Sequence, residues 1–395
     1  MRIFVKRRAW LAMVGALVGC TTPGTVPPPA APSTAGTTAP TPAPTGTPIE
    51  RENARWQPAA WADLPGWESD TPIHAWPALL QSCSKPAPGW AATCASAKAL
   101  ADPTDTRVRA WLQRTLQPYR VTARDGEASG LITGYFEPLV AASRTRSKTH
   151  GVPLHAPPAA LAARKPWYTR AEIDTLPAAR AALQGREIAW VADPLDALLL
   201  QVQGSGRLVV SESDGRSRTV RLAYAGHNDQ PYQSVGRWLV ERGAFTLEQA
   251  SWPAIKAWAR ANPGRVTEML NANPRYVFFR EEPLADPAVG AVGAQGVPLT
   301  PGRSIAVDPR AVPYGTPVWL DTTEPLLPAA NTARAAGGAP PAARPLQRLV
   351  LAQDTGSAIT GAVRADYFWG WTEGAEDYAG RMKQPLKMWV LWPRP

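Results

Sequence analysis

Two aspartates near the C-terminal end of the chain are the residues best suited to acid–base chemistry. Asp354 ends an apolar, strand-like run and is followed by Thr355-Gly356, a turn pattern. Asp366 is surrounded in the sequence by aromatic residues: Tyr367, Phe368, Trp369 and Trp371. Burial beside such surface favours the neutral carboxyl group, as a proton donor near neutral pH requires. Asp366 is therefore the candidate acid, although an isolated aspartate more often starts a turn or caps a segment.

The elements that would position these carboxylates are strands. Strands are predicted over 304–307, 316–320, 346–353 and 388–392. A third aspartate, Asp308, follows the first of them directly and precedes a proline. The Ala/Pro/Gly-rich insertion 322–344 reads as a surface loop. Three aspartates at or soon after strand ends in a mostly β region predict one shared site.

A further acid stands where an earlier strand enters a turn. Gly130 to Pro138 contains Tyr135 and Glu137, and Glu137 is either a partner in catalysis or, more in keeping with its place, a structural or substrate-positioning residue. Between 139 and 282 the composition changes, and strands predicted over 197–202 and 220–224 carry neutral polar residues and glycine at their ends. These residues are Gln203, Gly204, Ser205 and Tyr224. Glycine lets a ligand approach the backbone, and such polar side chains suit sugars.

Helices are predicted on both sides of these strands. The Trp-rich stretch 56–70 and residues 75–80 and 108–116 read as helical, as do 234–242, 247–261 and 265–272. Thr169 and Glu172 have the spacing of a capping box and predict a helix start.

The sequence does not indicate a serine hydrolase. Gly204-Ser205-Gly206 lacks the pattern of a serine-hydrolase elbow, and no His or Asp follows in the arrangement of a catalytic triad.

The first residues predict export. Four basic residues precede an apolar stretch over 9–18 that is short for a membrane span, and Leu17-Val18-Gly19-Cys20 resembles a bacterial lipobox. Residues 1–20 are thus a lipoprotein signal with Cys20 as the acylated residue; the alternative is an ordinary signal peptide with a coincidental cysteine. Residues 21–48 form a Pro/Thr/Ala-rich linker. Because Thr21 and Thr22 rather than an Asp directly follow Cys20, we expect an outer-membrane anchor facing the periplasm of a Gram-negative bacterium.

Charge and cysteine usage exclude several classes of function. The net charge is +10, of which four units precede Cys20, and the basic residues are scattered, so no nucleic-acid partner is expected. Cys83 and Cys94 are the cysteines that remain in the exported chain, and they predict a disulfide that closes a short loop. The four histidines form no ligand pattern, so neither a metal nor a cofactor is expected.

Six motifs together resemble the membrane-bound lytic murein transglycosylase A family. They are GYFEP at 134–138, QVQGSGR at 201–207, YAGHND at 224–229, NPRYVFF at 273–279, SIAVDPRAVPYGTPVWL at 304–320 and DTGSAITGAVRADYFWG at 354–370. The C-terminal part resembles the three-aspartate (3D) domain of that family. The resemblance implies a mainly β fold with helices: a double-psi β-barrel from 49–138 plus 283–395, an inserted β domain over 139–282, and a groove between them.

The resemblance also implies roles for single residues. Asp366 matches the catalytic acid/base, with Asp354 and Asp308 supporting the active site. The candidates for the groove walls are Tyr135, Glu137, Gln203, Gly204, Ser205 and Tyr224. The implied enzyme cleaves the β-1,4 bond between N-acetylmuramic acid (MurNAc) and N-acetylglucosamine (GlcNAc) without water and leaves 1,6-anhydroMurNAc ends.

The implied partners are peptidoglycan glycan strands and outer-membrane lipid at Cys20, and a complex for wall synthesis or remodelling stays open. Two other functions compete with the transglycosylase. One is a lipid-anchored, non-catalytic peptidoglycan-binding protein. The other is a conventional hydrolase that uses Glu137 as its second carboxylate.

Overall fold

The structure is a computed structural model that describes residues 46–394, apart from 213, 248 and 328–343. The expected signal segment with Cys20, most of the linker and the centre of the 322–344 insertion lie outside the described residues. Within the described part, no helix has the length and apolar character that crossing a membrane requires.

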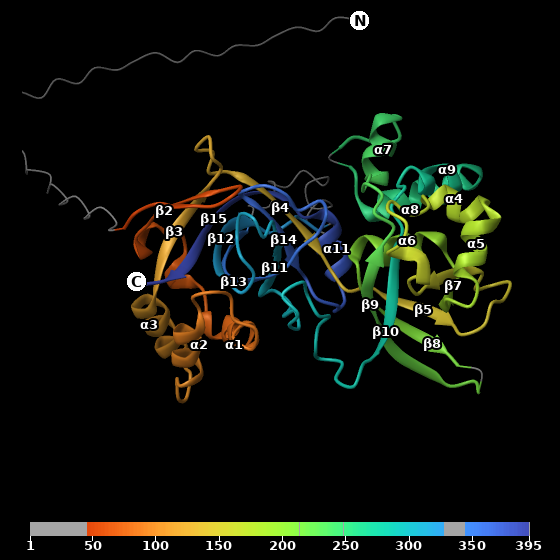
Figure 1. The fold of residues 1–395 in the computed structure, drawn as a ribbon. Coiled ribbons are helices and arrows are strands. Elements are labelled where there is room, and N and C mark those ends of the chain that lie inside the picture. The colour runs from red at the N-terminus through yellow and green to blue at the C-terminus, as the bar shows by residue number, and fades with distance from the viewer. Residues whose placement is uncertain (1–45, 213, 248, 328–343, 395) are drawn as a thin grey trace, which may run out of the picture. The chain divides into compact units, whose positions relative to one another are not determined.

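Nine strands form the larger sheet, and six of them close into a ring (Figure 1). In spatial order they are β1 (Ile49–Glu50), β2 (Arg55–Pro58), β3 (Leu116–Thr122), β15 (Lys383–Pro393), β12 (Pro317–Thr323), β13 (Pro345–Asp354), β11 (Ser304–Val307), β14 (Arg364–Phe368) and β4 (Gly130–Tyr135). Because β4 also pairs with β15, the strands from β15 to β4 form a closed barrel. Closure leaves these strands without a free edge.

The inside of the barrel is filled by alternate residues of its strands. Ile132, Ile305 and Val350 are fully buried there, together with Tyr367. Burying one such side chain contributes roughly 1.5–3 kcal/mol relative to leaving it exposed. β11 pairs in parallel with β13, and β14 pairs in parallel with β4, whereas β11 and β14 are antiparallel to each other. The ends of segments far apart in sequence are thereby brought side by side.

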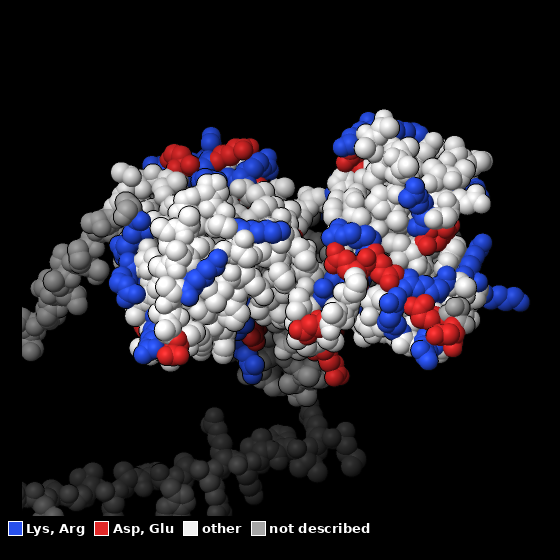
Figure 2. Space-filling view, turned by 60° about the horizontal axis from the view of Figure 1, so that its bottom comes forward, with Lys and Arg blue, Asp and Glu red and all other residues white. Residues whose placement is uncertain are grey.

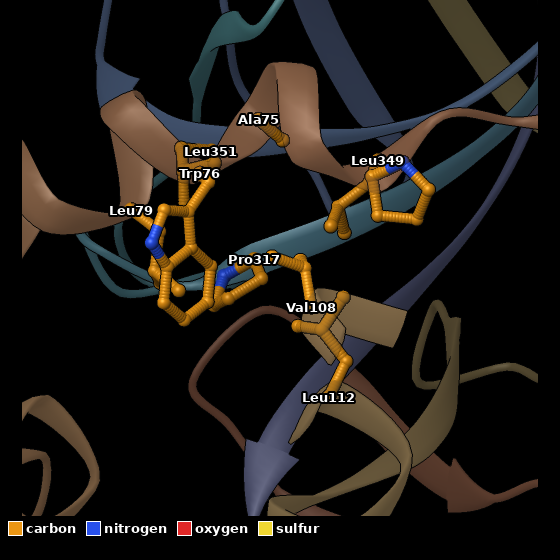
Figure 3. A pocket seen from close by; sticks show the side chains of 9 residues that line it. Ala75, Trp76, Leu79, Val108, Leu112, Pro317, Leu349 and Leu351 are labelled. Carbon is orange, nitrogen blue, oxygen red and sulfur yellow. The ribbon is translucent and has the colours of Figure 1, made fainter. Parts of the chain in front are cut away.

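Helices and tryptophans cover one side of the barrel. The helices are α1 (Trp76–Ser82), α2 (Ala91–Lys98) and α3 (Asp105–Thr115), preceded by the 3-10 turns η1 (Trp61–Asp63), η2 (Trp67–Ser69) and η3 (Pro72–Ala75). A disulfide joins Cys83, which directly follows α1, to Cys94 within α2. Figure 3 shows an apolar cavity of about 10 Å³ among these helices and strands β12 and β13. A cavity of this size has room for about one water molecule and no polar partner for it, so it is a packing defect rather than a ligand site.

The prediction of a helix over 56–70 is wrong. Trp56 lies in β2, and only short 3-10 turns follow. Pro58 ends the strand, and Pro65-Gly66 interrupts the rest, with Gly66 in a left-handed conformation at φ 71°. Proline and glycine at this spacing prevent a continuous helix.

A second sheet has six strands, all from the middle of the chain. Its order is β10 (Val277–Pro283), β9 (Ser217–His227), β8 (Gly206–Ser211), β5 (Leu139–Ser143), β7 (Glu187–Val191) and β6 (Val152–His155). The helices of this region are α4 (Arg170–Thr175), α5 (Pro177–Leu183), α6 (Pro194–Gln203), α7 (Val235–Glu241), α8 (Trp252–Ala261) and α9 (Val266–Asn271), with 3-10 turns η4 (Ala159–Leu161) and η5 (Pro263–Arg265). The Thr169–Glu172 capping box is present at the start of α4, as predicted.

The strand predicted over 197–202 is wrong, because these residues belong to α6. Asp193 caps the helix by accepting from the N–H of Leu195, and Pro194 occupies its first turn. Gly204 ends it in a left-handed conformation at φ 78°. A short apolar run does not distinguish a strand from a buried helix, and the capping residues decide here. α6 packs its Leu200 on the sheet and Leu198 on the outer helices.

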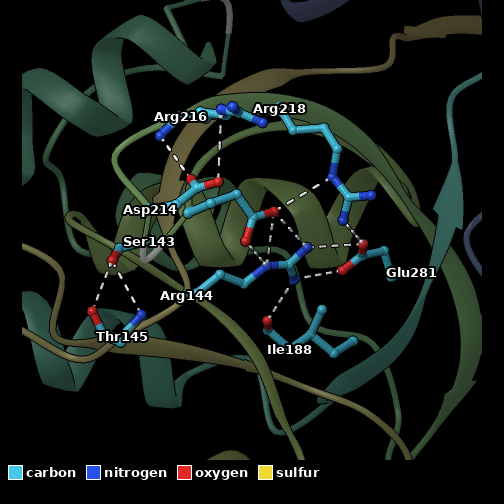
Figure 4. A network of polar contacts seen from close by, with 9 residues as sticks. Ser143, Arg144, Thr145, Ile188, Asp214, Arg216, Arg218 and Glu281 are labelled. Carbon is cyan, nitrogen blue, oxygen red and sulfur yellow. Dashed lines mark hydrogen bonds and ion pairs between the residues drawn. The ribbon is translucent and has the colours of Figure 1, made fainter.

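Polar contacts tie the strands of the second sheet together at one end. Figure 4 shows Arg144, just after β5, beside Glu281, and Arg144 also pairs with Glu212 at 3.3 Å. Arg144 donates to Glu281 at 2.5 and 2.9 Å and to the carbonyl oxygen of Ile188 at 3.1 Å. Arg218 adds a second cation to both acids. The network pairs charges of β9, β10 and the residues that follow β5 and β8, and a backbone hydrogen bond adds β7.

Basic side chains do not gather into one block on the face drawn in Figure 2. Lys and Arg are spread over that face and interspersed with acidic side chains on part of it. The expected mainly β fold, with a barrel and a second sheet accompanied by helices, is confirmed.

Candidate active site

Asp366 lies in the middle of β14 rather than at a strand end. It faces Ala306 of β11 on one side and Thr133 of β4 on the other. Flanking residues Ala365 and Tyr367 point to the opposite face and are fully buried in the barrel core. Asp366 itself keeps only part of its side chain exposed. A strand buried on one side thus holds the carboxylate rigidly on the other.

Thr133 links Asp366 to an arginine of the same strand. Its Oγ1 lies 2.7 Å from Oδ1 of Asp366, and Nη2 of Arg364 lies 2.9 Å from the same Oγ1. A guanidinium donates and never accepts, so Thr133 accepts from Arg364 and uses its own proton toward Asp366. Oδ1 is then an acceptor, which leaves Oδ2 as the oxygen that carries a proton in the neutral acid.

The surroundings of Asp366 raise its pKa to about 6. Burial has the largest effect, because it disfavours the charged form. The hydrogen bond from Thr133 and the charge of Arg364 lower the pKa in part, and the carboxylate of Asp354 raises it again. Near neutral pH both protonation states are accessible, which suits a group that must give and then take a proton.

Asp354, the last residue of β13, stands beside a tyrosine of β4. The hydroxyl of Tyr135 donates to its Oδ2 at 3.0 Å, and the N–H of Ala294 donates to its Oδ1 at 3.0 Å. Burial raises the pKa of Asp354, although these donors and the N–H of Thr355 lower it in part. Burial likewise raises the pKa of Tyr135, which therefore stays a donor. Both oxygens of Asp354 are engaged with the protein.

Asp308 has a different environment from the other two aspartates. It directly follows β11 and is 2% exposed. Its oxygens accept from the side chain and N–H of Arg310, from Asn53 at 2.9 Å and from the N–H of Gly361 at 2.9 Å. Burial alone would raise its pKa, but these donors outweigh burial and hold the pKa at about 2. Asp308 is a fixed anion that joins three chain segments.

Glu137 is enclosed by two arginines of the second sheet. Arg207 of β8 lies 3.0 Å from one carboxylate oxygen, and Arg221 of β9 lies 2.9 Å from the other. The Glu137 side chain has no exposed surface. Both arginines also donate to the carbonyl oxygen of Val289. In this arrangement Glu137 ties the end of β4 to the second sheet and has no free oxygen to offer a sugar.

The other expected wall residues lie at the end of α6 and in β9. Gln203 accepts from the N–H of Phe136 at 3.0 Å, so it contacts the chain directly after β4. Gly204 is the left-handed residue that ends α6, and Ser205 beside it is partly exposed. Tyr224 has 45% of its surface exposed. Of the two expected tyrosines, Tyr135 is hydrogen-bonded to Asp354, whereas Tyr224 lies in β9 of the second sheet.

Thr133 and Arg364 were missed from the sequence, as was Tyr232. Alternation along β4 could have indicated Thr133, because residues two apart face the same side and Tyr135 was already a candidate. No local signal points to Tyr232, whose hydroxyl lies in the field of Asp366. An open cavity of about 450 Å³ lined by Asp70, His74, Arg303 and Arg348 includes none of the three aspartates.

Comparisons with known proteins agree with this arrangement. The model of the MltA specific insert domain matches residues 131–280, and that of the 3D domain matches 303–392. Membrane-bound lytic murein transglycosylase A of Vibrio cholerae is 32% identical over 279 residues, which cover 70% of this chain and 69% of the relative.

Two solved structures are similar over most of the chain. Lytic transglycosylase LtgG of Burkholderia pseudomallei is 45% identical, with a TM-score of 0.58, and 89% of this chain and 99% of that one are covered. MltA from Neisseria gonorrhoeae is 29% identical, with a TM-score of 0.70 and coverage of 89% and 98%. The resemblance found in the sequence is thereby confirmed: the chain belongs to the membrane-bound lytic murein transglycosylase A family and is a peptidoglycan lytic transglycosylase.

Proposed function

We propose that this enzyme cleaves the β-1,4 bond between MurNAc and GlcNAc with Asp366 as its only acid–base catalyst. The observation that carries the proposal is the position of Asp366. It is a partly exposed carboxyl group in a rigid strand, with a pKa raised by burial to about 6 and one oxygen free of protein partners among the described residues.

The reaction needs one group that acts twice. Asp366 gives its proton from Oδ2 to the glycosidic oxygen as the C1–O bond breaks, and GlcNAc leaves with a free hydroxyl. The Asp366 carboxylate then takes the proton of the MurNAc C6 hydroxyl, and that oxygen bonds to C1 of the same ring. The product is a 1,6-anhydro ring, no water is consumed and Asp366 regains its proton. Because the nucleophile is part of the substrate, proximity replaces a second catalytic group.

The neighbouring carboxylates support this assignment over ordinary hydrolysis. A hydrolase needs a second carboxylate that can act as base or nucleophile. Glu137 is held by Arg207 and Arg221 and has no exposed surface. Asp354 accepts a hydrogen bond on each oxygen. We assign to Asp354, with its hydrogen-bond donor Tyr135, the role of raising the pKa of Asp366. We assign to Asp308 the role of joining the barrel turns through its hydrogen bonds.

The remaining parts of the proposal concern placement in the cell and along the chain. We propose that acylated Cys20 anchors the enzyme to the outer membrane and that 21–48 tethers it there. The proposed domains are 49–138 plus 283–395 and 139–282. The membership of the two sheets supports this division, because β5 to β10 all lie between Leu139 and Pro283. Gln203, Ser205 and Tyr224 are the proposed contacts of the second domain with the glycan.

Mass spectrometry of the products from purified murein tests the reaction. We expect the full-length enzyme to release fragments that end in 1,6-anhydroMurNAc, one water lighter than hydrolysis products. Reducing ends would refute the single-catalyst mechanism and direct the search to a second carboxylate. No release at all would favour a non-catalytic binding protein.

A further inference from the structure

Three side chains, those of Tyr224, His227 and Arg275, lie near one another where β9 meets the start of β10. Tyr224 lies opposite Phe279, and His227 lies opposite Val277, in an antiparallel pair. Opposite residues of such a pair face the same side, and residues two apart along a strand do so as well. Arg275 lies two residues before β10 begins, and its charge acts on both Tyr224 and His227. The rings of Tyr224 and His227 have centroids 6.4 Å apart.

The guanidinium of Arg275 is anchored at one nitrogen only. Its Nε donates to the carbonyl oxygen of Gln230 at 2.8 Å. The backbone is braced as well, because the N–H of Arg275 donates to Asn273 at 3.2 Å and its carbonyl oxygen accepts from Arg170 at 2.7 Å. Among the residues that the structure describes, Arg275 forms no ion pair, and its side chain is partly exposed. A fixed guanidinium thus presents two terminal nitrogens without a carboxylate.

The charges next to Arg275 do not neutralise it. Asp229 is the nearest acid in the sequence of this turn, but it lies 3.4 Å from the ammonium group of Lys165. Its backbone adopts a left-handed φ of 54°, a conformation that a non-glycine residue adopts only when its surroundings enforce it. Burial lowers the pKa of His227, and the charge of Arg275 lowers it further, so His227 is neutral near pH 7. The cluster keeps one net positive charge, that of Arg275.

One residue, Tyr232, lies near both Arg275 and the proposed catalytic aspartate. Tyr232 follows the turn that contains Asp229 and is largely buried. Burial raises the pKa of its hydroxyl; the charge of Asp366 raises it further, and the charge of Arg275 lowers it. Tyr232 is therefore near both charges.

We propose that Arg275 and Tyr224 form a subsite for a free carboxylate of the murein peptide stem. The inference rests on the proposed function and deepens it. A guanidinium fork binds a carboxylate through two parallel hydrogen bonds, and the exposed ring of Tyr224 gives the adjoining chain a flat apolar surface. The stem is attached to the lactyl group of MurNAc, so its first carboxylates lie only about 4–7 Å of extended chain beyond the reacting sugar.

Steady-state kinetics on two matched substrates test the subsite. The substrates are soluble glycan strands with intact stems and the same strands after an amidase has removed the stems. We expect full-length Arg275→Gln to show a KM raised about tenfold or more on intact strands, with kcat nearly unchanged. On stripped strands its KM should equal that of the wild type. Arg275→Lys keeps the charge without the fork and should fall between the two.

The control is Arg216→Gln, which removes an exposed arginine from the β8–β9 turn. It should match the wild type on both substrates, and an unchanged melting temperature of each variant excludes misfolding. An equal rise in KM on both substrates would overturn the proposal in favour of a contact with the sugars, which both substrates share. A rise on stripped strands alone would overturn it in favour of the lactyl carboxylate, which the amidase sets free. No change on either substrate would overturn it altogether. Failure of the wild type itself to form anhydro ends would refute the proposed function instead.

Discussion

Asp308 directly follows β11, and Asp366 lies in the neighbouring strand β14 of the same barrel. The pKa of Asp308 is lowered, whereas that of Asp366 is raised. Around Asp308, an arginine, an asparagine and backbone N–H groups converge on the carboxylate, and its pKa is about 2. Around Asp366, one hydroxyl group donates, and the pKa is about 6. Burial raises the pKa of both carboxyl groups, so burial alone does not separate them. The number of donors that reach each carboxylate decides which one stays charged and which one can carry a proton.

This contrast suggests that Asp308 contributes to the stability of the fold and Asp366 to its chemistry. A buried anion with several donors adds to the free energy of unfolding, whereas a poorly compensated one reduces it and is kept for its chemistry. Three substitutions would break or sharpen the comparison.

Asp366→Asn should have the largest effect. We expect kcat/KM on murein to fall about 10³-fold or more, because the proton donor and acceptor is lost. The folded protein should become more stable at pH 8, by up to about 3 kcal/mol, because the folded-state pKa of about 6 exceeds the unfolded value near 3.9. Ionised Asp366 therefore costs free energy above pH 6, and the advantage of the variant should shrink as pH falls from 6 to 4. Denaturant unfolding at several pH values measures this, and a variant less stable at pH 8 would contradict it.

Asp308→Asn should show the reverse pattern. The folded-state pKa of about 2 lies below the unfolded value near 3.9, so the ionised group stabilises the fold above pH 4. That stabilisation is lost as pH falls toward 2. We expect a loss of about 2–3 kcal/mol at pH 7, seen as a lower melting temperature, with activity retained at temperatures where the variant is folded. Asp377→Asn, at an exposed aspartate of α11 (Ala375–Arg381), is the matched control. A direct role of Asp308 in the reaction would instead appear as lost activity in the folded variant.

Thr133→Val should give the smallest of the three effects and show it in the pH profile. The hydrogen bond from Thr133 favours the ionised form of Asp366, so its removal should raise the pKa of Asp366 above about 6. The first step needs the neutral acid, and kcat/KM falls as pH rises through that pKa. The fall should move to higher pH by up to about one unit. Thr133→Ser keeps the hydroxyl and should restore the wild-type profile; a profile unchanged in the valine variant would show that Thr133 does not tune Asp366.

The sequence was sufficient for those features that local patterns encode. The strands of the barrel follow from their apolar runs, and Asp354 and Asp308 stand at strand ends as predicted. The family resemblance directed attention to Asp366. In contrast, the run 197–202 became a helix because Asp193 and Gly204 cap it, and local apolarity alone did not reveal this.

Long-range contacts account for what the sequence did not show. Thr133 and Asp366 are 233 positions apart, and Glu137 meets Arg221 across 84 positions. No local pattern reports that two arginines of another sheet enclose a glutamate, so its burial could not be foreseen. Arg275 likewise stands out only once the fold brings its charge near Tyr224, 51 positions earlier in the chain. The sequence shows which residue types are present, but only the folded chain shows which of them are in contact.

The closure of the barrel by β4 also determines how late in synthesis the proposed active site can form. β4 lies early in the chain, yet both of its partners, β14 and β15, are made last. Such distant pairings form late, because a long loop must be closed before they are rewarded. A nascent or truncated chain that lacks the residues after 363 has neither Asp366 nor the strand that holds Thr133 in register. Under the proposed mechanism, lytic activity therefore requires that synthesis be nearly complete.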